Sequence, residues 1–186
     1  MTDEQEVLWA EDEEELVEME HNEDAIVPLE YNVSSYGADY PVDSLVKRMQ
    51  GDNPDIVIPT FQRQYVWNIV RASRFIESLL LGLPVPGVFL HRDPETAQLV
   101  VIDGQQRLRT LQYFYGGTFA PTSEPFALKG VQSRFKEQTY FLLAPTDRRR
   151  LDEALLQATI ITQDVPSDDD GSIYDIFARL NAGGTP

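Results

Sequence analysis

Residues 102–107, Ile-Asp-Gly-Gln-Gln-Arg, combine the side-chain types that bind phosphate. They join an apolar run to a helical pattern, and the first turn of a helix carries free backbone N–H groups and partial positive charge. Gly104 would let a ligand approach the backbone, and the guanidinium groups of Arg107 and Arg109 suit phosphate oxygens. The sequence therefore predicts a nucleotide-phosphate site at this turn.

Side chains at the same turn could also support a reaction. Asp103 could hold a divalent metal such as Mg²⁺ through water, or act as a base. Gln105 or Gln106 could orient a water molecule for attack on a terminal phosphate. The structural alternative is that Asp103 caps the helix while Arg107 and Arg109 form surface ion pairs, and these residues alone leave both interpretations open.

A second cluster covers residues 58–67, Ile-Pro-Thr-Phe-Gln-Arg-Gln-Tyr-Val-Trp. Arg63 would contact phosphate there, while Tyr65 or Trp67 stacks on a base or packs against its sugar. Alternatively, the aromatic side chains anchor the loop in the core, which we expect of at least one of them. A third cluster, residues 177–184 (Phe-Ala-Arg-Leu-Asn-Ala-Gly-Gly), is also compatible with an ordinary helix end.

Hydrophobic periodicity and turn residues indicate the elements that position these clusters. Asn68 is expected to cap the helix after the second cluster, and Asp43 or Ser44 an earlier one. A turn over residues 93–96 should join two strands into a hairpin. The pattern predicts an α+β fold, a small mixed sheet with flanking helices. The expected helices cover 44–50, 68–81, 105–115, 148–157 and 173–180, and the strands cover 56–58, 85–90, 98–102, 139–143 and 159–162.

Composition narrows the function classes. The 186 residues, 42% of them hydrophobic, suffice for one ordinary core. The absence of cysteine excludes disulfides, thiolate nucleophiles and zinc-thiolate sites, and two histidines, His21 and His91, argue against a histidine-rich metal site. No long apolar run and no basic, apolar leader is present, so we expect a cytoplasmic protein without a membrane span.

The net charge of −16 is concentrated at the start of the chain. Residues 1–30 hold 13 acidic and no basic side chains, whereas residues 31–186 hold 18 acidic and 15 basic ones. We expect residues 1–30 to form a flexible acidic leader, because dense like charge resists compaction. Two alternatives remain: the leader mimics nucleic acid in a basic groove, or a short amphipathic helix within it docks on the domain or a partner.

In order, the three clusters resemble hallmark segments of the GmrSD-type restriction endonuclease N-terminal domain family. The matching segments are Ile58-Pro-x-Phe-Gln-Arg-x-Tyr-Val-Trp67, Asp103-Gly-Gln-Gln-Arg-Leu-x-Thr-Leu111 and Phe177-x-Arg-Leu-Asn-x-Gly-Gly184. The resemblance covers about residues 40–186. It implies a ParB/sulfiredoxin-like fold that binds nucleotide, and the lack of cysteine excludes the sulfiredoxin reaction.

The resemblance also implies roles for individual residues. The Asp-Gly-Gln-Gln-Arg turn becomes the nucleotide-binding and hydrolysis motif, with Mg²⁺ at Asp103 and a nucleoside triphosphate of unspecified base as cofactors. The catalytic candidates are Asp103, Gln105, Gln106 and Arg107. The nucleotide-binding candidates are Arg63, Gly104, Thr110, Arg179 and Asn181 in the matching segments, together with Tyr65 and Arg109, whose side-chain chemistry suggests the same function.

The expected partners are DNA, including modified DNA, and an HNH-type nuclease domain in cis or in trans; a homodimer is a further option. The chain has no His-Asn-His cluster of its own, so we do not expect it to be the nuclease. The domain over residues 40–186 would then end before a downstream helical or nuclease domain.

Three functions are compatible with these features. The first is a Mg²⁺-dependent nucleoside triphosphatase that acts as the sensor or regulator of a modification-dependent, phage-defence restriction system. The second is a binding module that recognises modified DNA or a partner nuclease without hydrolysis. The third is a protein-interaction segment based on the acidic leader. A carboxylate that completes a metal site beside the phosphate pocket would favour the first.

Overall fold

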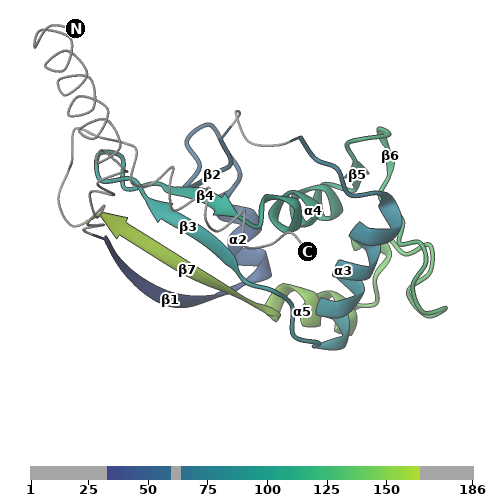
Figure 1. Ribbon diagram of the computed structural model, residues 1–186. Helices are drawn as coiled ribbons and strands as arrows, with labels where there is room; N and C mark the ends of the chain where they lie inside the picture. The colour runs from purple at the N-terminus through teal and green to yellow at the C-terminus, as the bar shows by residue number, and fades with distance from the viewer. Residues whose placement is uncertain (1–32, 60–63, 164–186) are drawn as a thin grey trace, which may run out of the picture. The chain divides into compact units, whose positions relative to one another are not determined.

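The computed structural model describes residues 33–59 and 64–163, which form an α+β domain (Figure 1). Its strands are β1 (Val33–Pro41), β2 (Ile56–Val57), β3 (Val88–Arg92), β4 (Leu99–Asp103), β5 (Thr118–Phe119), β6 (Glu124–Pro125) and β7 (Leu155–Gln163). Its helices are α2 (Val42–Arg48), α3 (Ile69–Leu81), α4 (Gln105–Gly116) and α5 (Pro145–Glu153), with a short 3-10 helix, η1 (Tyr140–Leu142).

Five strands form one mixed sheet in the order β1-β7-β3-β4-β2, and β5 pairs with β6 in a separate hairpin. The β1–β7 and β3–β4 pairs are antiparallel, whereas β3–β7 and β2–β4 are parallel. The sheet places the end of β4 beside the start of β3, because Asp103 is the partner of Phe89. The turn into α4 therefore lies next to the residues that precede β3.

The core lies between one face of this sheet and the helices. Along β7, buried Leu156, Ala158 and Ile160 alternate with more exposed neighbours, the period expected of a strand with one buried face. Helix α4 contributes Leu108, Leu111 and Phe114, which are completely buried. Helices α3 and α4 pack on each other; α3 also contacts α5, and α4 also contacts α2. The turn predicted to bind phosphate thus leads into a helix whose inner face is packed in the core.

Most expected elements around the motif are confirmed. The side chain of Asn68 caps α3 by accepting a hydrogen bond from the backbone N–H of Arg71 (2.9 Å). Strands β3 and β4 form the expected hairpin, and the Asp93 carboxylate accepts from the N–H groups of Glu95 and Thr96 in the turn. Gly117 adopts the left-handed conformation that ends α4. The expected α+β class with a small mixed sheet and flanking helices is confirmed.

Other element predictions are wrong. Helix α2 begins at Val42 after Pro41 and has no side-chain cap among the described residues, so neither Asp43 nor Ser44 caps it. Residues 139–143, expected as a strand, contain the 3-10 helix η1. The expected helix over 148–157 begins earlier, because Pro145 occupies a first-turn position, and it ends at Glu153. Strands β1, β5 and β6 were not expected.

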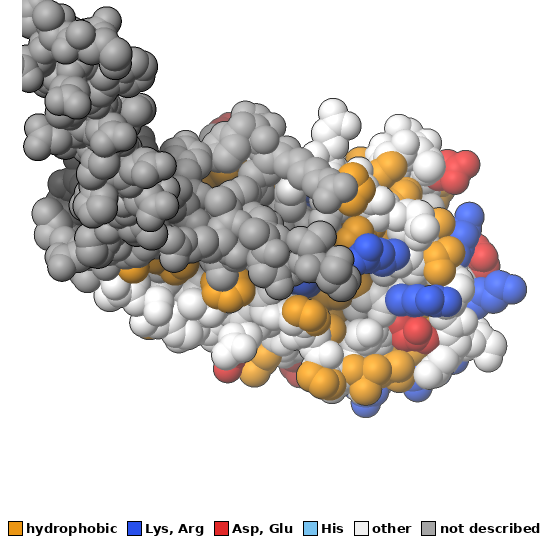
Figure 2. All heavy atoms as spheres, in the orientation of Figure 1, with side chains coloured by type: hydrophobic (Ala, Val, Ile, Leu, Met, Phe, Trp, Pro, Cys, Tyr) orange, Lys and Arg blue, Asp and Glu red, His pale blue; other side chains and the backbone are white. Residues whose placement is uncertain are grey.

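Some predictions fall outside the described residues: the acidic leader over 1–30, Arg63 in the second cluster, and the third cluster with its helix over 173–180. Among the helices that the structure describes, none has the length and apolar character that crossing a membrane requires. Lysine and arginine side chains gather on the side of the molecule where α3 lies (Figure 2), and Arg71 and Arg74 of that helix are both exposed. Acidic side chains lie among them on the same face, so the charge there is mixed (Figure 2).

Candidate functional site

Gly104 is the N-cap of α4 and adopts a left-handed conformation, with φ of 95° and ψ of 8°. A Cβ atom at this position would collide with Cγ1 of Val88 and lie 2.9 Å from its Cβ. The turn between β4 and α4 therefore requires glycine for its dihedral angles and for its contact with β3. No side chain in the described part of the chain caps α4, so the alternative in which Asp103 caps the helix is wrong.

Arg107 ties the motif to the residues before β3. Its Nη2 atom donates to the backbone oxygen of Gly87 (2.8 Å) and to Oδ2 of Asp103 (3.1 Å). The Arg107 side chain is 15% exposed, compared with 44% for Asp103, so this ion pair is only partly screened by solvent. The structural alternative gave Arg107 an ion pair at the surface. The structure shows the ion pair with the Arg107 side chain largely buried, so Arg107 has a structural function in addition to any contact with a ligand.

The two neighbouring glutamines have different surroundings. The Oε1 atom of Gln106 accepts from the backbone N–H groups of Val66 (2.9 Å) and Trp67 (3.4 Å). Its Nε2 atom donates to the backbone oxygen of Gln64 (3.2 Å). Gln105, by contrast, has its Oε1 atom buried without a hydrogen-bond partner in the described structure. Both amides had the same candidate function on sequence grounds, and the structure separates them.

Tyr65 contacts Thr110, which lies on α4 one turn after Gln106. Their hydroxyl oxygens lie 2.8 Å apart, and the hydroxyl of Thr110 also donates to the backbone oxygen of Gln106 (2.7 Å). Since a threonine hydroxyl has one proton, Thr110 accepts the hydrogen bond from Tyr65. Burial raises the pKa of Tyr65 to about 12. The phenol is therefore neutral and able to donate at physiological pH.

The aromatic side chains of the second cluster anchor it in the core. The ring of Tyr65 packs edge to face against Tyr113 and Phe119, with centroids 5.1 and 5.9 Å apart. Trp67 packs in the same manner against Phe75 (5.8 Å), and the guanidinium of Arg71 lies 4.7 Å from its ring centroid. The structural alternative for this cluster is thus confirmed for both residues.

Three polar atoms near the start of α4 are buried without a hydrogen-bond partner in the part of the chain that the structure describes. They are Oε1 of Gln105, Nε of Arg107 and Nε of Arg109. Gln105 and Arg109 are four residues apart, so they lie on the same side of the helix. Burying such atoms unpaired costs about 1–3 kcal/mol each. Gln105 and Arg109 therefore present an acceptor and a donor on one side of α4 that a bound ligand could satisfy, and Nε of Arg107 is a further donor beside Asp103.

The described residues contain no group of three or more histidine, aspartate or glutamate side chains that could hold a metal ion. At the turn before α4, Asp103 supplies a carboxylate, and its Oδ2 atom is paired with Arg107. Arg63, Arg179 and Asn181 lie outside the described residues. The structure brings the candidates from the sequence together in two groups. Asp103 and Arg107 pair beside Gly104 and Gly87, and Gln106, Thr110 and Tyr65 join α4 to the segment 64–67. Gln105 and Arg109 lie on the same helix.

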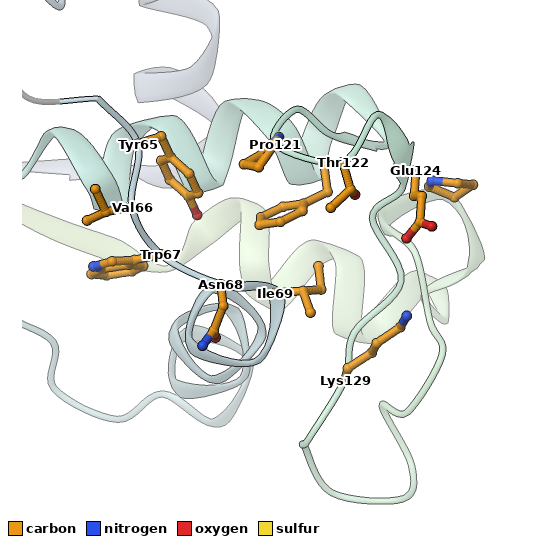
Figure 3. Close-up of a pocket in the computed structure, with 11 residues that line it drawn as sticks. Tyr65, Val66, Trp67, Asn68, Ile69, Pro121, Thr122, Glu124 and Lys129 are labelled. Carbon is orange, nitrogen blue, oxygen red and sulfur yellow. The ribbon is translucent and has the colours of Figure 1, made fainter.

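A cavity of about 370 Å³ lies beside the segment 64–67. Figure 3 shows Tyr65, Val66 and Trp67 on one side of it and Pro121, Thr122 and Glu124 on the other. Lys129, Asn68 and Ile69 at the start of α3, and Phe119 and Pro125 complete its lining. Sequence patterns could not identify this cavity, because the β5–β6 hairpin that forms one wall has strands of only two residues.

A second polar cluster lies at the other end of α4, where Asp152 of α5 accepts hydrogen bonds from Tyr115 (2.6 Å) and Tyr140 (3.1 Å). Burial, reinforced by Asp152, raises the pKa of Tyr140 to about 12, and that of Tyr115 also rises strongly, mainly through burial. Sequence reasoning missed this cluster, since its members lie in three separate elements. These hydrogen bonds stabilise the C-terminal end of α4, which is opposite to the end that carries the candidate site.

A search of curated proteins finds no match to this chain. Among solved structures, the chain is similar to the C-terminally truncated chromosome-partitioning protein ParB from Caulobacter crescentus, solved in complex with CTP-gamma-S. The sequence identity is 9% and the TM-score 0.39, and the match covers 81% of this chain and 55% of that one. The chain thus spans about half of that ParB, and so weak a similarity does not identify its own ligand.

The family comparison is more specific. The sequence matches the family described as GmrSD restriction endonuclease, N-terminal domain, over residues 42–186. The match includes all three clusters, of which the structure describes the Asp-Gly-Gln-Gln-Arg turn completely and the second cluster in part. It also begins at the first residue of α2 and covers most of the chain. The chain therefore belongs to the GmrSD restriction endonuclease N-terminal domain family.

Proposed function

We propose that this chain is a nucleoside-triphosphate-binding and hydrolysing domain that regulates a modification-dependent restriction system. The phosphates bind at the turn between β4 and α4. One observation carries the proposal: the buried, unpaired Oε1 of Gln105, Nε of Arg107 and Nε of Arg109 at the start of α4, as seen within the described residues. Membership of a restriction endonuclease family supports the biological context.

The chemistry of these atoms matches a phosphate ester and a water molecule. Nε of Arg107 and Nε of Arg109 are donors, and phosphate oxygens are strong acceptors that would satisfy both. Oε1 of Gln105 is an acceptor, so its natural partner is a donor such as the water that attacks the terminal phosphorus. The helix dipole and the free N–H groups of the first turn add attraction for the same anion.

Mg²⁺ would neutralise charge on the phosphates when bound. We assign its water-mediated contact to Asp103, whose side chain is 44% exposed and is held in place by Arg107. Within the family context we further propose that nucleotide turnover controls an HNH-type nuclease domain, in cis or in trans, that acts on DNA.

The test is calorimetric titration of the full chain with each of the four nucleoside triphosphates and Mg²⁺, with phosphate release measured on the same samples. Binding with release supports the proposal, and binding without release identifies a sensor that does not turn over. Absence of binding to all four would refute the nucleotide site and favour a module for modified DNA or a partner protein.

A matched pair of arginine variants locates the site. Arg109→Ala should weaken triphosphate binding at least about tenfold, the loss of about 1.4 kcal/mol, because it removes one of the buried donors. Arg149→Ala removes the same charge from an exposed position on α5 and should leave binding unchanged. Equal affinity of the two variants would place the phosphates elsewhere.

A further inference from the structure

The segment from Gln64 to Trp67 has no helix or strand hydrogen bonding of its own in the described structure. The side-chain amide of Gln106 supplies a substitute, because it accepts from two consecutive backbone N–H groups and donates to a carbonyl oxygen. One turn further along α4, Thr110 holds the same segment through the hydroxyl of Tyr65. Two side chains on one face of α4 therefore hold four consecutive residues.

The amide of Gln106 has little capacity left for a water molecule. A glutamine oxygen has two lone pairs, and Val66 and Trp67 use both. To orient an attacking water as an acceptor, Gln106 would have to release one of these N–H groups. The oxygen of Gln105 is buried and carries no such bond within the described residues. The two adjacent amides are thus suited to different tasks.

We infer that Gln106 is a positioning residue, which holds the segment 64–67 against the first two turns of α4. If the chain hydrolyses nucleotide as proposed above, Gln106 determines the affinity for the nucleotide and not the rate of the chemical step. Gln105 is the residue of the pair that faces the reacting water. The segment held by Gln106 also forms one wall of the 370 Å³ cavity, so its release would alter that cavity.

Two isosteric variants separate these functions. Gln106→Met keeps the length of the side chain and removes all three hydrogen bonds, and Gln105→Met makes the same change one residue earlier. We expect Gln106→Met to raise KM for the triphosphate about tenfold while kcat stays within about threefold. We expect Gln105→Met to leave KM nearly unchanged and to lower kcat about 100-fold, the scale of one lost interaction with a transition state.

Gln106→Glu provides a graded variant. A carboxylate can still accept from Val66 and Trp67 but cannot donate to the oxygen of Gln64. KM for this variant should lie between those of the parent chain and Gln106→Met. A loss of kcat in both Gln106 variants, with KM unchanged, would overturn the inference and identify Gln106 as the catalytic amide.

A second readout needs no nucleotide. The chain has two tryptophans, Trp9 and Trp67, so in a Trp9→Phe background all tryptophan emission comes from the held segment. Gln106→Met should shift this emission and increase hydrogen exchange at the N–H of Val66, whereas Gln105→Met should do neither. If the parent chain binds no nucleotide, the proposed function fails but this test still decides the inference. Identical emission and exchange in both variants would show that Gln106 does not hold the segment.

Discussion

At the scale of single residues, the start of α4 depends on Gly104 for two separable reasons: its left-handed backbone and its contact with Val88. Gly82, at the end of α3, has the first property without the second. Its backbone is also left-handed, but a Cβ atom there would meet no heavy atom of the described residues within 4 Å. The pair therefore distinguishes backbone strain from steric conflict.

We predict that Gly104→Ala lowers the free energy of unfolding by about 3 kcal/mol, the sum of a left-handed penalty and overpacking against Val88. Gly82→Ala should lose only about 1 kcal/mol. Urea denaturation followed by circular dichroism measures both. Equal losses would mean that β3 moves away from the turn without energetic consequence.

The candidate site was predictable from sequence only in part, and individual residues show why. The turn at Asp103 and Gly104 was predictable, because a strand, a glycine and a helical pattern adjoin in sequence. The different hydrogen-bond partners of Gln105 and Gln106 could not be predicted, because they depend on the side of α4 against which the segment 64–67 packs. The hydrogen bond from Arg107 to the oxygen of Gly87 could not be predicted either, because it joins residues that only the β3–β4 pairing brings together.

At the scale of elements, the start of α3 depends on its cap, Asn68, which also lines the cavity together with Ile69. Asn68→Ala removes the acceptor for the N–H of Arg71, and we expect a loss of about 1 kcal/mol in the free energy of unfolding. Asn68→Asp retains an acceptor and should lose little. Thermal denaturation of the two variants checks this. A full loss in Asn68→Asp as well would show that the amide nitrogen, and not the cap, stabilises the helix.

The elements that sequence patterns predicted are those with a strong apolar period and a clear start or stop. Helix α3 has both, with an asparagine cap and a terminal Gly82. Strand β1 has neither: among the described strands only β7 pairs with it, and most of its side chains are exposed, so no alternation of apolar residues marks it. In residues 139–143, apolar residues suggested a strand, but Phe141 and Leu142 are exposed in a 3-10 turn that leads into the proline at the start of α5.

At the scale of the whole molecule, three partly buried tyrosines, Tyr65, Tyr115 and Tyr140, couple stability to alkaline pH. Burial raises the pKa of Tyr65 and of Tyr140 to about 12, from 10.0 in an exposed tyrosine, and raises that of Tyr115 as well. The folded state thus favours the neutral phenols. Their contribution is complete below pH 10 and is lost as the pH rises from 10 through 12, because the unfolded chain releases the protons first.

We therefore predict that the urea midpoint is constant from about pH 8 to just below 10 and falls steeply above it. In Tyr115→Phe the fall should be shallower, because one of the three phenols is absent, although the midpoint at about pH 8 should be lower through loss of the bond to Asp152. Phenolate absorbance of the native chain should appear later than that of the urea-unfolded chain. Coincident absorbance curves would contradict the proposed coupling.

The register of β1 with β7 has a mechanical consequence. Val33 is paired with Gln163, so the chain enters and leaves the described sheet at the same end of one antiparallel ladder. Ladder hydrogen bonds run perpendicular to the strands, and tension applied at these two points would therefore load them one pair at a time, as in opening a zipper. Along this direction the domain should yield at low force and shed β1 first, while the hydrophobic core beneath α4 is still intact.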